Sequence, residues 1–229
     1  MSTTRMASRK SEIANATARV RRPMPGLVLV LIVVSLVGCT SLIGGSKQPS
    51  TIYAPTTHVQ PSPEWPSVRW RLALGRTFGA RNADSMRIVV RPTPNEVQVY
   101  KDAQWANSPG DMLEDAVLHA LEDSGRIAEV ARQGAGIGAD YRLLLDVRRF
   151  ESDYAGAATP KATIEVTAKL VHIKDQQLAG SRTFVHAQPA GSTAVADVVA
   201  AFEQALAATS RDIAGWTLAT GESYARTHL

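Results

Sequence analysis

The spacing of apolar residues predicts short strands in the first half of the folded part of the chain, followed by a helix. Runs rich in β-branched and aromatic residues, separated by turn formers, occupy residues 69–74, 86–91 and 97–100. Ser108-Pro109-Gly110-Asp111 then combines an N-cap serine, a proline at the first helical position and an acid three residues after the cap. Apolar residues at helical spacing follow this motif, so we expect a helix that ends before Gly125.

The second half of the chain has a more regular pattern. Residues 141–150 are strongly apolar at their start, and residues 164–170 alternate between apolar and polar side chains. This alternation puts one face of a sheet on a core and the other in water. Residues 180–187 are expected to return antiparallel through a turn at Asp175-Gln176. From residue 195 to residue 216, apolar side chains recur at helical spacing, which predicts a long helix covering the sheet.

The order of these elements indicates the fold class. Strands, a helix, strands and a helix follow one another without long alternating βαβ units. We therefore expect an α+β fold in which an antiparallel sheet is covered by two helices, as a single domain over residues 65–218. Residues 219–229 are expected to form a flexible C-terminal tail.

The first 38 residues have the layout of a secretory signal peptide. Six basic side chains and one acid accompany an apolar run over residues 27–37, and Gly38-Cys39 follows. The run has 11 residues, whereas a helix needs about 20 to cross a bilayer, so a permanent spanning helix is not expected. Leu36-Val37-Gly38-Cys39 resembles the lipobox of bacterial lipoproteins, in which the thiol is alkylated with diacylglycerol before the signal is cleaved. Cys39 is therefore the predicted lipidation site.

Residues 39–64 are expected to form a flexible tether behind this anchor. They are rich in Ser, Thr, Gly and Pro, a composition that buries too little apolar surface to offset the entropy of ordering. In the general lipoprotein pattern, Thr40 after the cysteine, rather than aspartate, favours export to the outer membrane. The protein would then be lipid-anchored on the periplasmic side of the outer membrane of a Gram-negative bacterium.

Charge and residue counts exclude several classes of function. Without residues 1–38, the chain has 19 basic and 20 acidic side chains, a net charge of −1, so the excess positive charge belongs to the leader. A nucleic-acid partner is therefore not expected. A single cysteine excludes an intramolecular disulfide framework and a multi-cysteine metal site.

The remaining candidate residues do not form a catalytic pattern. In the predicted hairpin, His172 and His186 lie roughly 23 Å apart, and His119 falls on the solvated face of the first helix. Gly134, Gly136 and Gly138 lack the spacing of a dinucleotide fingerprint and are expected in a strand connection. No G-x-S-x-G, H-E-x-x-H or P-loop motif occurs. We therefore predict no catalytic residue, no metal and no cofactor.

Two tryptophans carry more information. Trp216 continues the apolar stripe of the last helix and is expected in the core. Trp105 lies in a polar context between a strand and the helix cap. A packing role is favoured for Trp105, and a contact with a partner protein is the alternative.

The order of segments in residues 65–218 resembles that of the ABC-type transport auxiliary lipoproteins, the family that includes PqiC-like proteins. The similar segments, besides the lipobox, include Asp84-Ser85-Met86-Arg87-Ile88, Glu96-Val97-Gln98-Val99-Tyr100, Ala103-Gln104-Trp105-Ala106, Ala139-Asp140-Tyr141-Arg142-Leu143, Arg182-Thr183-Phe184 and Trp216. Ala83 and Gly110 depart from the family pattern.

The resemblance implies a non-enzymatic accessory of an envelope lipid transport system that contains an ABC permease and an MCE-domain protein. A domain on an outer-membrane tether would dock the far end of such a conduit for phospholipid or a related lipid. Two alternatives remain open: a structural lipoprotein that assists assembly of an outer-membrane complex, and a periplasmic hydrolase whose Ser, His and Asp side chains converge in a pocket. A homo-oligomer is compatible with each of these functions.

Overall fold

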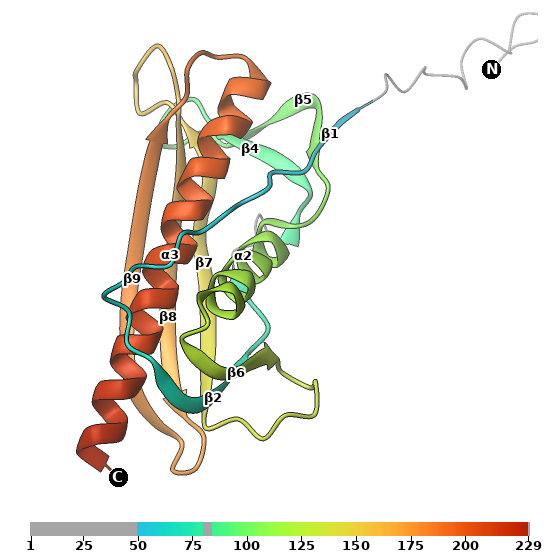
Figure 1. Cartoon of the computed structure of the whole chain (residues 1–229). Coiled ribbons are helices and arrows are strands. Elements are labelled where there is room, and N and C mark those ends of the chain that lie inside the picture. The colour runs from blue at the N-terminus through green and yellow to red at the C-terminus, as the bar shows by residue number, and fades with distance from the viewer. Residues whose placement is uncertain (1–49, 80–83, 229) are drawn as a thin grey trace, which may run out of the picture. The chain divides into compact units, whose positions relative to one another are not determined.

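Three long antiparallel strands form one side of the sheet in the computed structural model, which describes residues 50–79 and 84–228 (Figure 1). These strands are β7 (Tyr141–Asp153), β8 (Lys161–His172) and β9 (Gln177–Pro189). β8 pairs with both neighbours along its whole length. The signal peptide 1–38, Cys39 and the first part of the tether lie outside the described residues.

The predicted hairpin between β8 and β9 is confirmed, but its register differs from the one that a symmetric turn predicts, which pairs His172 near Ala179 and His186 near Glu165. The turn falls at Asp175-Gln176, where Gln176 has a φ of 59°. His172 pairs with Gln177, and His186 pairs with Ile164. The register shifts near Leu170 because β9 contains one extra residue there, a local bulge that alternation of side chains does not reveal.

Short strands extend the sheet on the other side of β7, which makes the sheet mixed rather than wholly antiparallel. Along this edge β7 pairs in parallel with β2 (Val68–Leu74), β3 (Phe78–Gly79) and β4 (Arg87–Arg91). Beyond them lie β6 (Ile127–Arg132), parallel to β2, β5 (Gln98–Trp105), antiparallel to β4, and β1 (Thr51–Tyr53), parallel to β5. Hydrophobic periodicity predicts strands but not their direction, which depends on the connections. The α+β class and the single sheet-and-helix domain are confirmed.

β7 runs the length of the domain from one end to the other. β2 pairs with the start of β7, where Leu72 is opposite Tyr141, and β4 pairs with its end, where Val90 is opposite Ser152. Eleven residues along a strand correspond to about 36 Å. We name the end with β1, β4 and β5 the entry end, because the described chain begins there. The end with β2, β6 and the β8–β9 turn is the distal end.

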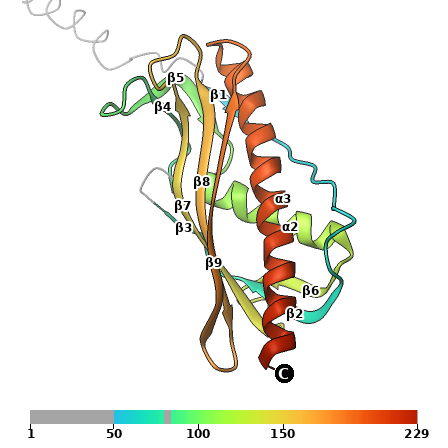
Figure 2. The ribbon, with the colours of Figure 1, turned by 90° about the vertical axis from the view of Figure 1, so that its left-hand side faces the viewer.

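Two helices cover one face of the sheet and leave the other face open (Figure 2). α2 (Pro109–Ser124) begins at the predicted cap, where the Ser108 side chain accepts a hydrogen bond from the backbone N–H of Asp111. Gly125, with a φ of 59°, ends the helix as predicted. α3 (Val195–His228) packs against β8, β9 and α2.

α3 is longer than its predicted range, so the expected flexible tail over 219–229 is wrong for residues 219–228. Gly221 is buried against the ring of Trp70, and Tyr224 packs edge-on against Tyr141 with 6.2 Å between ring centroids. Leu218, Gly221 and Tyr224 continue the contact with the sheet at three-residue spacing. The small and polar residues among them weaken the apolar signal without ending the helix.

The core lies between the sheet and the two helices and includes Trp105. The side chain of Trp105 is 1% exposed, and its ring contacts Phe150 and Phe202 edge-to-face. A partner contact through Trp105 is therefore wrong, and the packing role is correct. Trp105 ends β5 facing the helices, whereas the polar residues around it in sequence lie on the other face or in the turn.

The second part of the expected tether also packs on the domain. Residues 51–53 form β1, and Tyr53 and Val59 pack against the core. These two apolar side chains anchor a segment whose average composition predicts disorder. The glycine-rich stretch 134–138 connects β6 to β7, as predicted.

Candidate functional site

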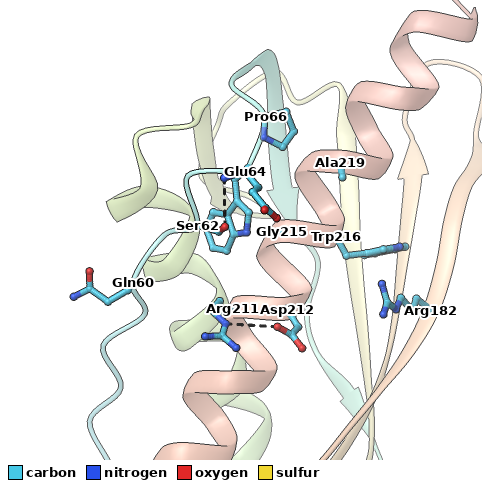
Figure 3. A pocket seen from close by; sticks show the side chains of 11 residues that line it. Gln60, Ser62, Glu64, Pro66, Arg182, Arg211, Asp212, Gly215, Trp216 and Ala219 are labelled. Atoms are coloured by element: carbon cyan, nitrogen blue, oxygen red, sulfur yellow. Dashed lines mark hydrogen bonds and ion pairs between the residues drawn. The ribbon is translucent and has the colours of Figure 1, made fainter.

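A groove of about 690 Å³ lies along α3 (Figure 3). Residues 60–66 form one wall, and Arg182 of β9 and Trp216 of α3 form the other. The α3 residues Arg211, Asp212, Gly215 and Ala219 complete the lining. We name this feature the α3 groove.

One wall of the α3 groove depends on a close contact between Trp65 and Gly215. A Cβ atom at position 215 would lie 2.5 Å from Nε1 of Trp65, so only glycine admits the indole without a shift. The backbone N–H of Trp65 donates to the carbonyl of Ser62 over 3.1 Å and tightens the turn that carries the ring. The wall formed by residues 60–66 therefore packs directly against α3.

The other wall combines an aromatic ring with a guanidinium group. Trp216 packs edge-on against Phe184 at a centroid distance of 5.9 Å. The guanidinium of Arg182 lies 5.0 Å from the centre of the Phe184 ring. Trp216 is half-buried, so it packs on the core as predicted and also lines the groove.

Charges in the α3 groove are balanced. Oδ1 of Asp212 lies 3.6 Å from Nε of Arg211, and Oδ2 lies 3.2 Å from Nε2 of His186. Glu64 is an exposed acid on the opposite wall, and Arg182 is exposed. Trp and Arg are enriched among the residues that dominate protein interfaces. An open groove with two tryptophans, two arginines and two carboxylates is typical of a protein-binding surface.

A second cavity, of about 670 Å³, lies at the distal end between β2, the start of β7, the β8–β9 turn and α3. Its lining includes Arg69, Trp70, Asp140, Tyr141, Lys174 and Glu222. We name it the distal pocket. Its volume is within the range of about 300–1,000 Å³ that is typical of small-molecule sites.

Aromatic rings form the buried side of the distal pocket. Trp70 and Tyr141 pack edge-on with 4.9 Å between centroids. The Tyr141 hydroxyl donates to the carbonyl of Gly221 over 3.2 Å, and burial raises the pKa of Tyr141 to about 12. The phenol therefore stays protonated at physiological pH and holds α3 to the sheet.

Asp175 attaches the β8–β9 turn to the end of α3. Its carboxylate accepts the backbone N–H of Gln177 over 3.0 Å and the hydroxyl of Tyr224 over 3.1 Å, and it lies 2.9 Å from Nδ1 of His172. The backbone N–H of Gln177, assisted by His172 and Tyr224, lowers the pKa of Asp175. The carboxylate therefore remains ionised and keeps the turn beside the pocket.

A charge network occupies the open face of the sheet. Glu151 is 4% exposed and pairs with Nε of Arg91 at 2.9 Å and with Nε of Arg149 at 2.7 Å. Burial alone would raise the pKa of Glu151, but hydrogen bonds from the two arginines outweigh it and lower the pKa. Every strong acceptor in this network is already satisfied by a guanidinium, which indicates a structural role.

Histidine side chains lie beside carboxylates at two places in the described part of the chain. The two histidine–carboxylate pairs are His172 with Asp175 and His186 with Asp212. Within residues 50–79 and 84–228, no hydrogen bond joins a serine to either histidine, and no cluster of three His, Cys, Asp or Glu side chains is arranged to hold a metal ion. His119 is exposed on α2, as predicted.

Sequence reasoning missed both cavities because each joins segments that are distant in the chain. The α3 groove brings Trp65 to Trp216, and the distal pocket brings Arg69 to Lys174 and Glu222. No local motif marks either set. The only signal for the groove is the position of Trp216 on the apolar stripe of a long helix, which predicts burial but not the groove beside it.

Comparison with known proteins identifies the family. The sequence model of the family described as ABC-type transport auxiliary lipoprotein component matches residues 51–214. The chain belongs to this family. Among the described residues, no helix has the length and apolar character needed to traverse a bilayer.

Solved structures agree with the fold, and a curated protein is related in sequence. Protein XCC0632 from Xanthomonas campestris is 55% identical, with a TM-score of 0.75 over 77% of this chain and 99% of that chain. A second solved protein, described as uncharacterized, is 18% identical with a TM-score of 0.57 over 73% of this chain and 97% of that one. An uncharacterized protein of Bradyrhizobium diazoefficiens is 25% identical over 185 residues, which are 80% of this chain and 49% of that protein. The chain thus spans about half the length of this curated relative.

Proposed function

We propose that this protein is a non-enzymatic docking component of an MCE-type ABC lipid transport system, anchored to the outer membrane through Cys39. Family membership supports a role as an auxiliary of ABC transport. The observation that carries the docking role is the α3 groove, because it combines the side chains that protein interfaces favour with an open, charge-balanced surface.

The location of the groove fits a contact with a large partner. It extends over one long helix and the neighbouring chain segment, and its rings are held by the core through Gly215 and Phe184. Rigid aromatic anchors lose little conformational freedom on binding. An MCE-domain protein at the end of a lipid conduit is the expected partner.

In-cell crosslinking tests the docking role. A photoreactive residue at Ala219, which is exposed and lines the groove, should capture an MCE-domain protein identified by mass spectrometry. The same probe at His119, exposed on α2, is the control and should not capture it. Equal capture at both positions, or capture of an outer-membrane β-barrel protein instead, would contradict the proposal.

Lipidation is tested separately at the cysteine. Cys39→Ala should abolish labelling of the protein by radioactive palmitate and leave an unprocessed precursor. Label retained in this variant would disprove the anchor.

A further inference from the structure

We propose that the distal pocket binds the headgroup of an anionic phospholipid, with the phosphate between Arg69 and Lys174 and the adjoining apolar part against the aromatic side of the pocket. The choice of a phospholipid rests on the proposed function. The presence of a site for a phosphate-bearing amphiphile rests on the charge, shape and lining described below.

The two carboxylates that line the distal pocket each have an arginine partner, whereas its two cations have no carboxylate partner in the described part of the chain. Asp140 accepts the backbone N–H of Arg71 over 2.8 Å and lies 3.6 Å from its Nε, and Glu222 pairs with Nε of Arg226 at 3.1 Å. Arg69 and Lys174 are exposed, and in the described part of the chain neither forms a salt bridge. The lining thus holds two cations and two carboxylates, but only the carboxylates are paired, so Arg69 and Lys174 can bind a phosphate through charge-assisted hydrogen bonds.

The deeper part of the pocket is apolar and aromatic. Trp70, which is 8% exposed, and Tyr141 lie beside Ile173 and two alanines of the lining. The buried indole N–H of Trp70 finds no hydrogen-bond acceptor among the described residues. An ion alone would leave this apolar surface uncovered, whereas a glycerophospholipid would cover it.

The position of the pocket suits a transport intermediate. The distal pocket contains the start of β7, whereas the described chain begins at the entry end, about 36 Å away along that strand. A lipid bound there would be well separated from the point at which the domain joins its tether.

Photocrosslinking to labelled lipid in cells tests the site in the full chain. p-Benzoylphenylalanine at Ile173, which lines the pocket, should acquire ³²P after irradiation of cells grown with radioactive phosphate. The diacylglycerol expected on Cys39 contains no phosphorus, so the label reports a second lipid. Mass spectrometry of the adduct should show a glycerophospholipid with its acyl chains. Ala139, also in the lining, is an independent position should the first substitution disturb folding.

Charge variants make the test specific. The double variant Arg69→Gln/Lys174→Gln should lower the ³²P adduct at least tenfold. Arg87→Gln/Lys169→Gln removes the same charge from two exposed side chains that form no salt bridge in the described part of the chain, and it should change the adduct less than twofold. This comparison separates local recognition from a general effect of net charge.

Three results would overturn the inference. They are the absence of ³²P at both probe positions in folded protein, an adduct unaffected by the Arg69 and Lys174 changes, and an adduct that contains phosphate without acyl chains. The partner crosslink at Ala219 is read independently. Lipid labelling without partner capture would support the pocket and contradict the docking role. Partner capture without lipid labelling would support the docking role and contradict the pocket.

Discussion

Replacing Gly221 with alanine tests how α3 is seated on the sheet. A Cβ atom at this position would lie 2.5 Å from Cζ2 of Trp70 and 3.0 Å from two further indole carbons. The ring cannot easily move away, because Trp70 is 8% exposed and packs on Tyr141 at 4.9 Å. Either the indole or the helix must shift, and a shift of the helix would also break the hydrogen bond from Tyr141 to the Gly221 carbonyl.

The expected cost follows from three opposing contributions. Overpacking a core costs about 1–3 kcal/mol, and a lost hydrogen bond costs about 1 kcal/mol. Alanine in place of glycine within a helix stabilises the helix by about 1 kcal/mol. Gly221→Ala should therefore lower the free energy of unfolding by about 1–3 kcal/mol. An exposed helical glycine would give the opposite sign.

Equilibrium urea unfolding, followed by tryptophan fluorescence, measures this change. The smaller ring in Trp70→Phe relieves the contact, so Gly221→Ala introduced into that background should be close to neutral or stabilising. If Gly221→Ala stabilises the protein with Trp70 present, or destabilises it equally in both backgrounds, the contact between the indole and α3 does not determine the seating of the helix.

Three further substitutions probe the core, the groove and the charge network. Trp105→Ala should destabilise the protein by about 3–5 kcal/mol in the same unfolding assay because it opens a cavity beside the stacked rings of Phe150 and Phe202, and a cost below about 1 kcal/mol would contradict its burial. Trp216→Ala should instead abolish partner capture at Ala219 and retain a folded domain by circular dichroism, whereas undiminished capture would remove Trp216 from the interface. The pKa of Glu151 is lower in the folded protein than its usual 4.5. Its contribution to the free energy of unfolding is therefore fully present above pH 4.5 and declines as the pH falls through the folded pKa. Glu151→Gln should lower stability at pH 7 by about 2–3 kcal/mol, and thermal unfolding should show a smaller loss on acidification below pH 4.5 than in the unmodified protein; identical pH profiles would refute this.

The sequence predicted well those helix ends and turns whose signals lie in neighbouring residues. The serine cap and Gly125 define α2 through contacts within one turn of the helix. The turn at Asp175-Gln176 follows from local polarity between two alternating strands. The parallel direction of β2, β3 and β4 was not predictable in this way, because it depends on which edge of β7 each strand joins.

The candidate sites were the least predictable part of the molecule. Arg69 and Lys174 are ordinary exposed cations in the sequence, and they acquire a shared environment only when β2 joins the start of β7 beside the β8–β9 turn. Trp105 illustrates the opposite case, since its polar neighbours in the sequence left a partner contact open as the alternative to packing, whereas its position at the end of β5 buries it. Burial and proximity are properties of tertiary contacts, which the local pattern does not contain.

The full-length pairing of β7, β8 and β9 constrains how this domain can change in length during evolution. Unless a bulge absorbs the change, as near Leu170, deleting one residue from any of these strands would exchange its inward and outward side chains beyond that point. Where no bulge intervenes, a shorter or longer domain needs matched changes of two residues in all three strands, each altering the separation of the two ends by about 7 Å. Family members should accordingly keep this span and vary in loops instead.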